Sequence, residues 1–216
     1  MDEPLTRTAA SSAVDGTSWR LVLGGLRRTV ATSSLGDATA LAGAVVDVLG
    51  PTECPHVRLD VRPDVLGLTV RSPGVGVTAA DVEIARRLDD RLAGSDEAPS
   101  PPTRCLEVAI DAIDIPNVRR FWQAVLGYDE SGDDELTDPR GQLPTFWFQQ
   151  MDVPRTERNR IHVDLSVPHD QAEAIVAAGL AAGGTLVSAA AARAFWVLAD
   201  PEGNEVCVCT WQDRDG

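Results

Sequence analysis

The second half of the chain contains an internal repeat, which constrains the fold more than any other feature of the sequence. The segment Leu106-Glu-Val-Ala-Ile-Asp111 alternates inward and outward positions, and an amphipathic stretch through Val118 to Leu126 follows it. The same order returns at Ile161-His-Val-Asp-Leu-Ser166 and at Gln171 to Ala182, and each copy continues into glycine and further short strands. Because period-two alternation indicates strands and a period near 3.6 indicates helices, the repeat predicts two βαβββ modules.

The length of the chain and one proline-rich segment predict two domains. The 216 residues exceed one small domain and suffice for two of about 100 residues each. The segment from Gly94 to Thr103 holds three prolines among small polar residues, which is typical of a connection between domains. We therefore expect a flexible tail over residues 1–16, a first domain over 17–93, a linker over 94–103 and a second domain over 104–212.

The first domain is predicted to be a small α+β unit. Two strand-like segments flank Gly24-Gly25, which is a hairpin signal, and the segments 57–61 and 66–70 alternate apolar and polar residues. Helices are expected over 37–49 and 81–92, the second opened by a capping box of Thr78 and Asp81. The expected fold class is α+β: a four-stranded antiparallel sheet with helices on one face, followed by the two modules as a cupped sheet.

The charge of the chain argues against several classes of partner. A formal net charge of −14 at pH 7 repels phosphate backbones and anionic headgroups, so we expect neither nucleic acid nor a membrane as partner. The N-terminal residues show no secretory leader pattern, and no segment approaches the roughly 18 apolar residues of a membrane span. We therefore expect a cytoplasmic protein whose four cysteines are free thiols.

Two family resemblances add to this reading. The second half resembles the glyoxalase/bleomycin-resistance group, also called vicinal oxygen chelate proteins, through Phe121-Trp-Gln-Ala-Val-Leu-Gly-Tyr128, Arg160-Ile-His-Val-Asp-Leu165 and Asp200-Pro-Glu-Gly-Asn204. The first half resembles pterin-4a-carbinolamine dehydratase, chiefly through the stretch from Gly76 to Leu88. These resemblances imply a homodimer that takes a small-molecule ligand, with activity of a lyase or isomerase type.

The first resemblance implies a metal site, but the residues at the matching positions of this sequence are not the usual ligand set. The family holds a divalent metal, mostly with His and Glu, on the first and last strands of both modules, and the matching residues here are Glu107, Gln149, His162 and Cys207. Strand alternation independently places Glu107, His162 and Cys207 on the concave face. Because Mg²⁺ and Mn²⁺ gain little from a thiol, we expect a pocket without the usual metal set, in which His162 hydrogen-bonds a ligand. A divalent metal on the four residues, or a structural His162 beside a buried Cys207, are the alternatives.

Further residues of the second half are candidates for the same pocket. Asp164 and Glu205 share the concave face, where burial would raise a carboxyl pKa toward that of a general base, and the alternative is a pair of solvated acids. Aromatic residues are frequent in this half and suit a flat organic ligand, although single aromatics more often belong to a core. The expected catalytic residues here are His162, Glu107 and Asp164, and the expected ligand-binding residues are Gln149, Trp147, Cys207, Glu205, Phe195 and Trp122.

The second resemblance implies a proton relay that is incomplete here. Dehydratases of this family use several histidines and an acid, because imidazole transfers protons near neutral pH. Only His56 and Asp81 match, while Pro55 and Pro73 occupy or adjoin positions where the family has histidines. His56 and Asp81 are therefore candidate catalytic residues, and the alternative is a scaffold or dimerisation domain in which Asp81 caps its helix.

Three functions are consistent with the sequence. The first is binding or conversion of a small aromatic or polyketide-like metabolite in the C-terminal cup, without the usual metal set. The second is a 4a-hydroxytetrahydrobiopterin dehydratase with an appended glyoxalase-like domain. The third is a resistance protein that sequesters a drug without turnover. Fold alone does not decide among them, because function depends on the site.

Overall fold

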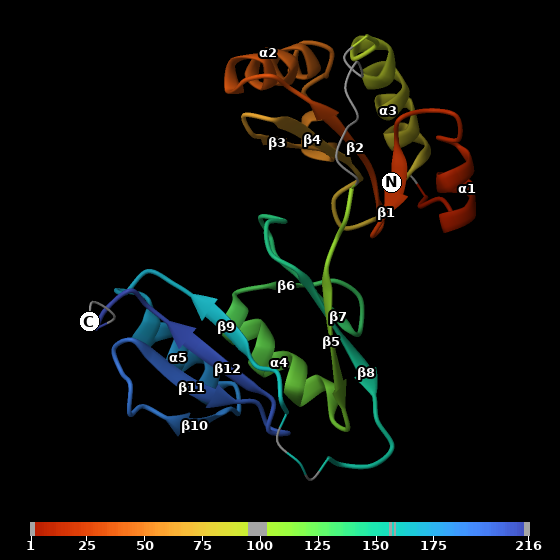
Figure 1. Ribbon diagram of the computed structural model, residues 1–216. Coiled ribbons are helices and arrows are strands. Elements are labelled where there is room, and N and C mark those ends of the chain that lie inside the picture. Colours follow the sequence, from red (N-terminus) through yellow and green to blue (C-terminus); the bar gives the residue numbers. More distant parts are fainter. Residues whose placement is uncertain (1–2, 95–102, 156, 158, 214–216) are drawn as a thin grey trace. The chain divides into compact units, whose positions relative to one another are not determined.

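The structure, a computed structural model, describes residues 3–94, 103–155, 157 and 159–213 (Figure 1). It consists of two compact units, Met1–Cys105 and Leu106–Gly216. The expected linker over 94–103 ends two residues before the last residue of the first unit, and its residues 95–102 lie outside the described residues.

The first unit has the predicted antiparallel sheet. Its strands pair in the order β1-β2-β4-β3, and all pairs are antiparallel. Leu26 and Val30 of β2 lie opposite Val70 and Leu66 of β4, so one face of the sheet is apolar and packs under the helices. The elements are β1 (Arg20–Val22), β2 (Gly25–Ala31), α2 (Leu35–Val46), the short 3-10 helix η1 (Cys54–His56), β3 (Val57–Val61), β4 (Val65–Val70) and α3 (Ala79–Arg91).

The hairpin turn of this sheet lies one residue before the predicted position. Val22 pairs with Gly25, so the two turn residues are Leu23 and Gly24, with φ angles of 45° and 63°. Two-residue hairpins favour such left-handed turns because their twist matches that of the strands. Gly25 is therefore free to begin β2, where an added Cβ would lie 3.2 Å from Thr69.

The prediction of a flexible tail over residues 1–16 is wrong. Residues Arg7–Ser12 form helix α1, capped by Thr6, whose side chain accepts a hydrogen bond from the Ala9 amide. Ala10 and Val14 are buried in the core of the first unit, with 1% and 3% exposure. The sequence did not reveal this because small residues on one short turn give no measurable amphipathic period.

The second unit consists of the two predicted modules. Their sheets have the same order, β5-β8-β7-β6 and β9-β12-β11-β10, with the first and last strand of each module paired in parallel. The internal repeat is thereby confirmed at the level of topology. The elements are β5 (Glu107–Ala112), α4 (Ile115–Leu126), β6 (Asp129–Glu130), β7 (Glu135–Thr137), β8 (Thr145–Gln150), β9 (Val163–Ser166), α5 (Ala172–Ala181), β10 (Thr185–Ser188), β11 (Phe195–Ala199) and β12 (Glu205–Cys209).

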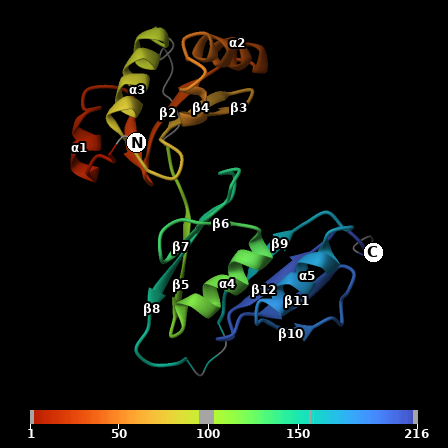
Figure 2. The same cartoon turned by 180° about the vertical axis from the view of Figure 1, so that it is seen from behind.

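Helices α4 and α5 lie on the same side of the strands (Figure 2). Their close approach depends on Gly179, because an added Cβ there would lie only 2.8 Å from the Val125 side chain. A single apolar core joins the helices to the inner faces of both sheets, which leaves the opposite faces of β5, β9 and β12 open to the candidate site. Within the described part of the chain, no helix has the length and apolar character needed to cross a bilayer.

Candidate functional site

Side chains along β5, β9 and β12 alternate between the two faces of the sheets. Val108 and Ile110 of β5 pack in the core, whereas Glu107, Ala109 and Asp111 are exposed on the other face. On β9 and β12, the valines and Leu165 likewise face the core, and the intervening residues face away from it. The functional candidates of both modules therefore lie on the face opposite to the helices.

A cleft of about 980 Å³ lies between the two modules. Glu107 and Asp111 of β5 line it from the first module, and His162 and Glu205 line it from the second. The connection between the modules contributes Arg155, Asn159 and Arg160. This volume falls at the upper end of the range of small-molecule sites, which are typically about 300–1,000 Å³.

The turn Asp200-Pro-Glu-Gly-Asn204 connects the modules at one end of the cleft. The Asp200 side chain is buried and accepts hydrogen bonds from the Glu202 amide, the Asn204 amide and side chain, and the Trp122 indole at 2.8–3.0 Å. The Glu202 carboxylate accepts from the amides of Ile113 and Asp114 in the first module, at 2.6–2.9 Å. The turn thus holds the two modules in register around the cleft.

A second cavity of about 490 Å³ lies on the second module alone. Its lining includes His162, Asp164, Cys207, Cys209 and Phe195. Cys207 lies directly opposite Asp164 because β12 and β9 pair in parallel in that register. The ligand atoms of His162, Asp164 and Cys207 all lie within 4.8 Å of one another, and His162 Nε2 is 3.3 Å from Asp164 Oδ1. We call these three residues the His-Asp-Cys group.

The thiol of Cys207 is held in its protonated form. Burial raises the pKa of Cys207 to about 11, and Asp164 adds to the shift by accepting a hydrogen bond from the thiol and by its negative charge. The exposed fraction of Cys207 is 8%, whereas the side chains of His162 and Asp164 are 50% and 61% exposed at the cavity rim.

We predict that Cys207 reacts slowly with iodoacetamide at neutral pH. A thiol pKa of about 11 instead of 9.0 lowers the thiolate fraction roughly 100-fold, and the thiolate is the reactive form. Asp164→Asn removes a negative charge beside the thiol and should accelerate the reaction. Mass spectrometry of a Cys54→Ser/Cys105→Ser background, which lacks the two exposed cysteines, gives the rate. Acceleration by Glu107→Gln but not by Asp164→Asn would contradict this assignment of neighbours.

The four residues that the family resemblance would assign to a metal are not brought together. Glu107 lines the intermodule cleft but lies outside the His-Asp-Cys group. Gln149 is exposed on β8, two residues after Trp147, and lines neither cavity. Of the four, only His162 and Cys207 fall within one group of possible metal ligands in the described structure, and Glu107 shares only the cleft with His162, so the donor set does not fit the family's two-module metal site.

The aromatic candidates occupy different environments. Trp122 is 1% exposed in the core, where its ring packs 5.2 Å from Phe146, although one edge of it reaches the cleft. Trp147 is half-buried beside Gln149 on β8 and lines neither cavity, while Phe195 lines the smaller one. The cleft is therefore lined mainly by polar and aliphatic side chains rather than by an aromatic wall.

The connection at residues 151–161 supplies cleft residues that sequence reasoning missed. Asn159 donates from its side chain to Asn204 at 2.6 Å, and Arg155 donates to Asn159, so the connection is tied to the turn at 200–204. These residues precede β9, and their sequence shows neither the period of a strand nor that of a helix. No sequence pattern therefore identified them as cleft residues. The only available signal was their density of Arg and Asn directly before His162.

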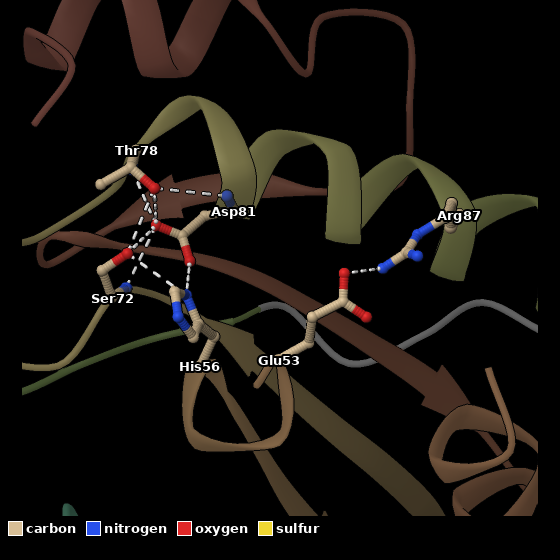
Figure 3. Close-up of polar contacts among 6 residues, drawn as sticks. All are labelled: Glu53, His56, Ser72, Thr78, Asp81 and Arg87. Atoms are coloured by element: carbon tan, nitrogen blue, oxygen red, sulfur yellow. Dashed lines mark hydrogen bonds and ion pairs between the residues drawn. The ribbon is translucent and has the colours of Figure 1, made fainter. Parts of the chain in front are cut away.

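The first unit contains a separate polar cluster around Asp81 (Figure 3). Nδ1 of His56 lies 2.7 Å from Asp81 Oδ1, and Asp81 Oδ2 accepts from the amides and hydroxyls of Ser72 and Thr78 at 2.7–3.1 Å. Asp81 is fully buried at the start of α3, where it completes the predicted capping box with Thr78. The structure thus brings together His56 and Asp81, the two candidate residues of the first unit.

The cluster fixes the charge of Asp81 and orients His56. Burial alone would raise the pKa of Asp81, but the hydrogen bonds from His56, Thr78 and Ser72 outweigh it and hold the pKa below its ordinary value. An ionised carboxylate only accepts hydrogen bonds, so Nδ1 of His56 is the donor. In the neutral ring this leaves Nε2 as the acceptor, and the side chain of His56 is 23% exposed.

Comparison with known proteins finds similarity for the second unit. Residues 107–209 match the family described as "Glyoxalase-like domain". Solved structures that match this chain include a glyoxalase/bleomycin resistance protein from Albidiferax ferrireducens T118, with 24% identity, coverage of 48% of this chain and 95% of that chain, and a TM-score of 0.39. The fosfomycin resistance protein FosX from Listeria monocytogenes matches with 12% identity, coverage of 51% and 93%, and a TM-score of 0.40. No curated protein matches the chain.

Proposed function

We propose that the glyoxalase-like domain at residues 107–209 binds a small organic molecule in the cleft between its modules and acts on it through His162 and Glu107. The observation that carries the proposal is the cleft itself, because about 980 Å³ of space receives an imidazole and several carboxylates from both modules. Convergence of a few polar groups on one well-formed pocket is the usual mark of a ligand site.

The side chains that line the cleft restrict the chemical class of ligand that it can bind. Five acids line the cleft against two arginines and His162, so the ligand carries several hydrogen-bond donors or a positive charge in addition to apolar surface. Aliphatic contacts come from Ile113, Ile161 and Val163. A hydroxylated aromatic or polyketide-like metabolite meets these requirements.

His162 and Glu107 face the ligand from opposite modules. A ligand held between them would meet an imidazole on one side and a carboxylate on the other, and this pair supports proton transfer of a lyase or isomerase type. Asp164 contacts His162 from the side of the smaller cavity, where it orients the imidazole. A protein that binds without turnover would use the same cleft to sequester its ligand.

A thermal-shift screen against hydroxylated aromatic and polyketide-type compounds tests this proposal. Compounds that bind the cleft should raise the melting temperature of the wild-type protein and should lose this effect in His162→Ala. Product analysis of each binder by mass spectrometry then separates conversion from sequestration. A binder that stabilises wild type and His162→Ala equally would contradict the role assigned to the cleft.

A second candidate function rests on the His56–Asp81 contact of 2.7 Å. In this candidate the first unit transfers protons through Nε2 of His56, as in a pterin-4a-carbinolamine dehydratase, while Asp81 orients the ring. Pro55 and Pro73 replace or adjoin the further imidazoles that such a relay uses, so His56 would work alone.

We predict that the dehydratase activity of the full chain is weak. With one imidazole in place of a relay, turnover of 4a-hydroxytetrahydrobiopterin should fall below roughly 1 s⁻¹. Whatever activity remains should disappear in His56→Ala. Turnover at or above that rate, sensitive to His56→Ala, would make the dehydratase reaction the function of the first unit.

A further inference from the structure

The His-Asp-Cys group combines three kinds of metal ligand on one small surface. His162 supplies an imidazole, Asp164 a carboxylate and Cys207 a thiol, and their ligand atoms all lie within 4.8 Å of one another. All three belong to the second module, so the group is complete without Glu107 or Gln149. It therefore differs in both location and chemistry from a site that draws ligands from both modules.

We propose that the His-Asp-Cys group binds a borderline-soft divalent cation such as Zn²⁺. Imidazole, thiolate and carboxylate are the three ligand types that Zn²⁺ prefers in proteins, whereas Mg²⁺ and Ca²⁺ select oxygen ligands alone. The thiol of Cys207 therefore favours Zn²⁺ over Mg²⁺ and Ca²⁺ at this group.

The distances require only a small adjustment. Zinc bonds of about 2.0–2.3 Å in a tetrahedron separate neighbouring ligand atoms by about 3.3–3.6 Å. His162 Nε2 and Asp164 Oδ1 are already 3.3 Å apart. Both side chains lie at the cavity rim and are at least half exposed, so they can move toward the buried Cys207 without displacing the core.

The smaller cavity leaves room for a fourth ligand. All three side chains line its volume of about 490 Å³, so a cation held by them would keep one position for water or another small ligand. Three protein ligands with one open position are typical of catalytic rather than structural zinc sites. Cys209 lines the same cavity but is not a member of the group, which makes it a matched control for Cys207.

Titration of the metal-free full chain with Co²⁺ tests the proposal. A Cys54→Ser/Cys105→Ser background removes the two exposed thiols as adventitious ligands. One equivalent of Co²⁺ should bind with a sulfur-to-cobalt charge-transfer band in the near ultraviolet, and Zn²⁺ should displace it. Cys207→Ser should abolish the band, and Asp164→Asn should weaken Zn²⁺ binding at least roughly 100-fold, the upper end of the loss caused by removing an indirect partner.

Two control variants keep the result independent of folding. Cys209→Ser removes a neighbouring buried thiol, and Glu107→Gln removes a carboxylate of the other module, and both should keep the band and the affinity. A band that survives Cys207→Ser, or Zn²⁺ binding that depends on Glu107 rather than Asp164, would overturn the proposal, as would the absence of a bound equivalent. These outcomes do not bear on the ligand proposed for the larger cleft, because the thermal-shift screen measures that binding separately.

Discussion

Asp81→Ala should destabilise the first unit by about 4 kcal/mol. The substitution removes the acceptor of five hydrogen bonds and leaves buried amide and hydroxyl donors of Ser72 and Thr78 without their partner. It also removes the capping box of α3. Urea unfolding of the full chain gives the change in the free energy of unfolding.

Glu83→Ala is the matched control on the same helix. Glu83 pairs with Arg86 at the surface, with side chains that are 67% and 53% exposed, so its loss should cost less than about 0.5 kcal/mol. Equal destabilisation by the two variants would contradict the buried network at Asp81.

The same network makes the stability of the first unit depend on pH in the acidic range. Because hydrogen bonds hold the pKa of Asp81 below its unfolded value of about 3.9, ionised Asp81 stabilises the fold above that pH. This contribution is lost as the pH falls through the lower, folded-state pKa. Wild type and Asp81→Asn should therefore converge in stability as the solution is acidified below about pH 4.

Trp122→Ala should destabilise the second unit by about 4 kcal/mol. The indole is 1% exposed, contacts the rings of Phe121 and Phe146, and donates to Asp200 at 2.9 Å. Removing it leaves a large cavity and takes one donor from a buried carboxylate. Calorimetry of Trp122→Ala beside Trp211→Ala, whose side chain is 63% exposed, measures the difference. If Trp122→Ala left the stability nearly unchanged but abolished ligand binding, Trp122 would instead be a ligand-binding residue.

The repeat and the strand parity could be predicted because they depend on local periodicity. Each apolar residue of β5 and β9 that was expected under the helices lies there, so the side of the sheet that carries His162 followed from the sequence. The capping box at Thr78 was predicted for the same reason, since its two residues are three apart in sequence.

The neighbours of Cys207 could not be predicted because they depend on register. Asp164 lies opposite Cys207 through a parallel pairing of strands more than 40 residues apart, and a shift of two residues would have brought a different side chain there. The link from Glu202 to the amides of Ile113 and Asp114 is equally long-range. Helix α1 was missed because its burial comes from Ala10 and Val14 alone, which no local pattern marks.

Blocking the intermodule cleft tests the proposed function most directly. Ala109 is exposed on β5 and lines the cleft, so Ala109→Trp would fill part of its volume without disturbing the core. Leu186→Trp places the same side chain at an exposed position of β10, which lines neither cavity, and serves as the control. Isothermal titration with the strongest binder of the thermal-shift screen should show at least a roughly 100-fold loss of affinity, about 2.7 kcal/mol, in Ala109→Trp and none in Leu186→Trp. Unchanged affinity in Ala109→Trp would show that the ligand binds elsewhere and would contradict the account.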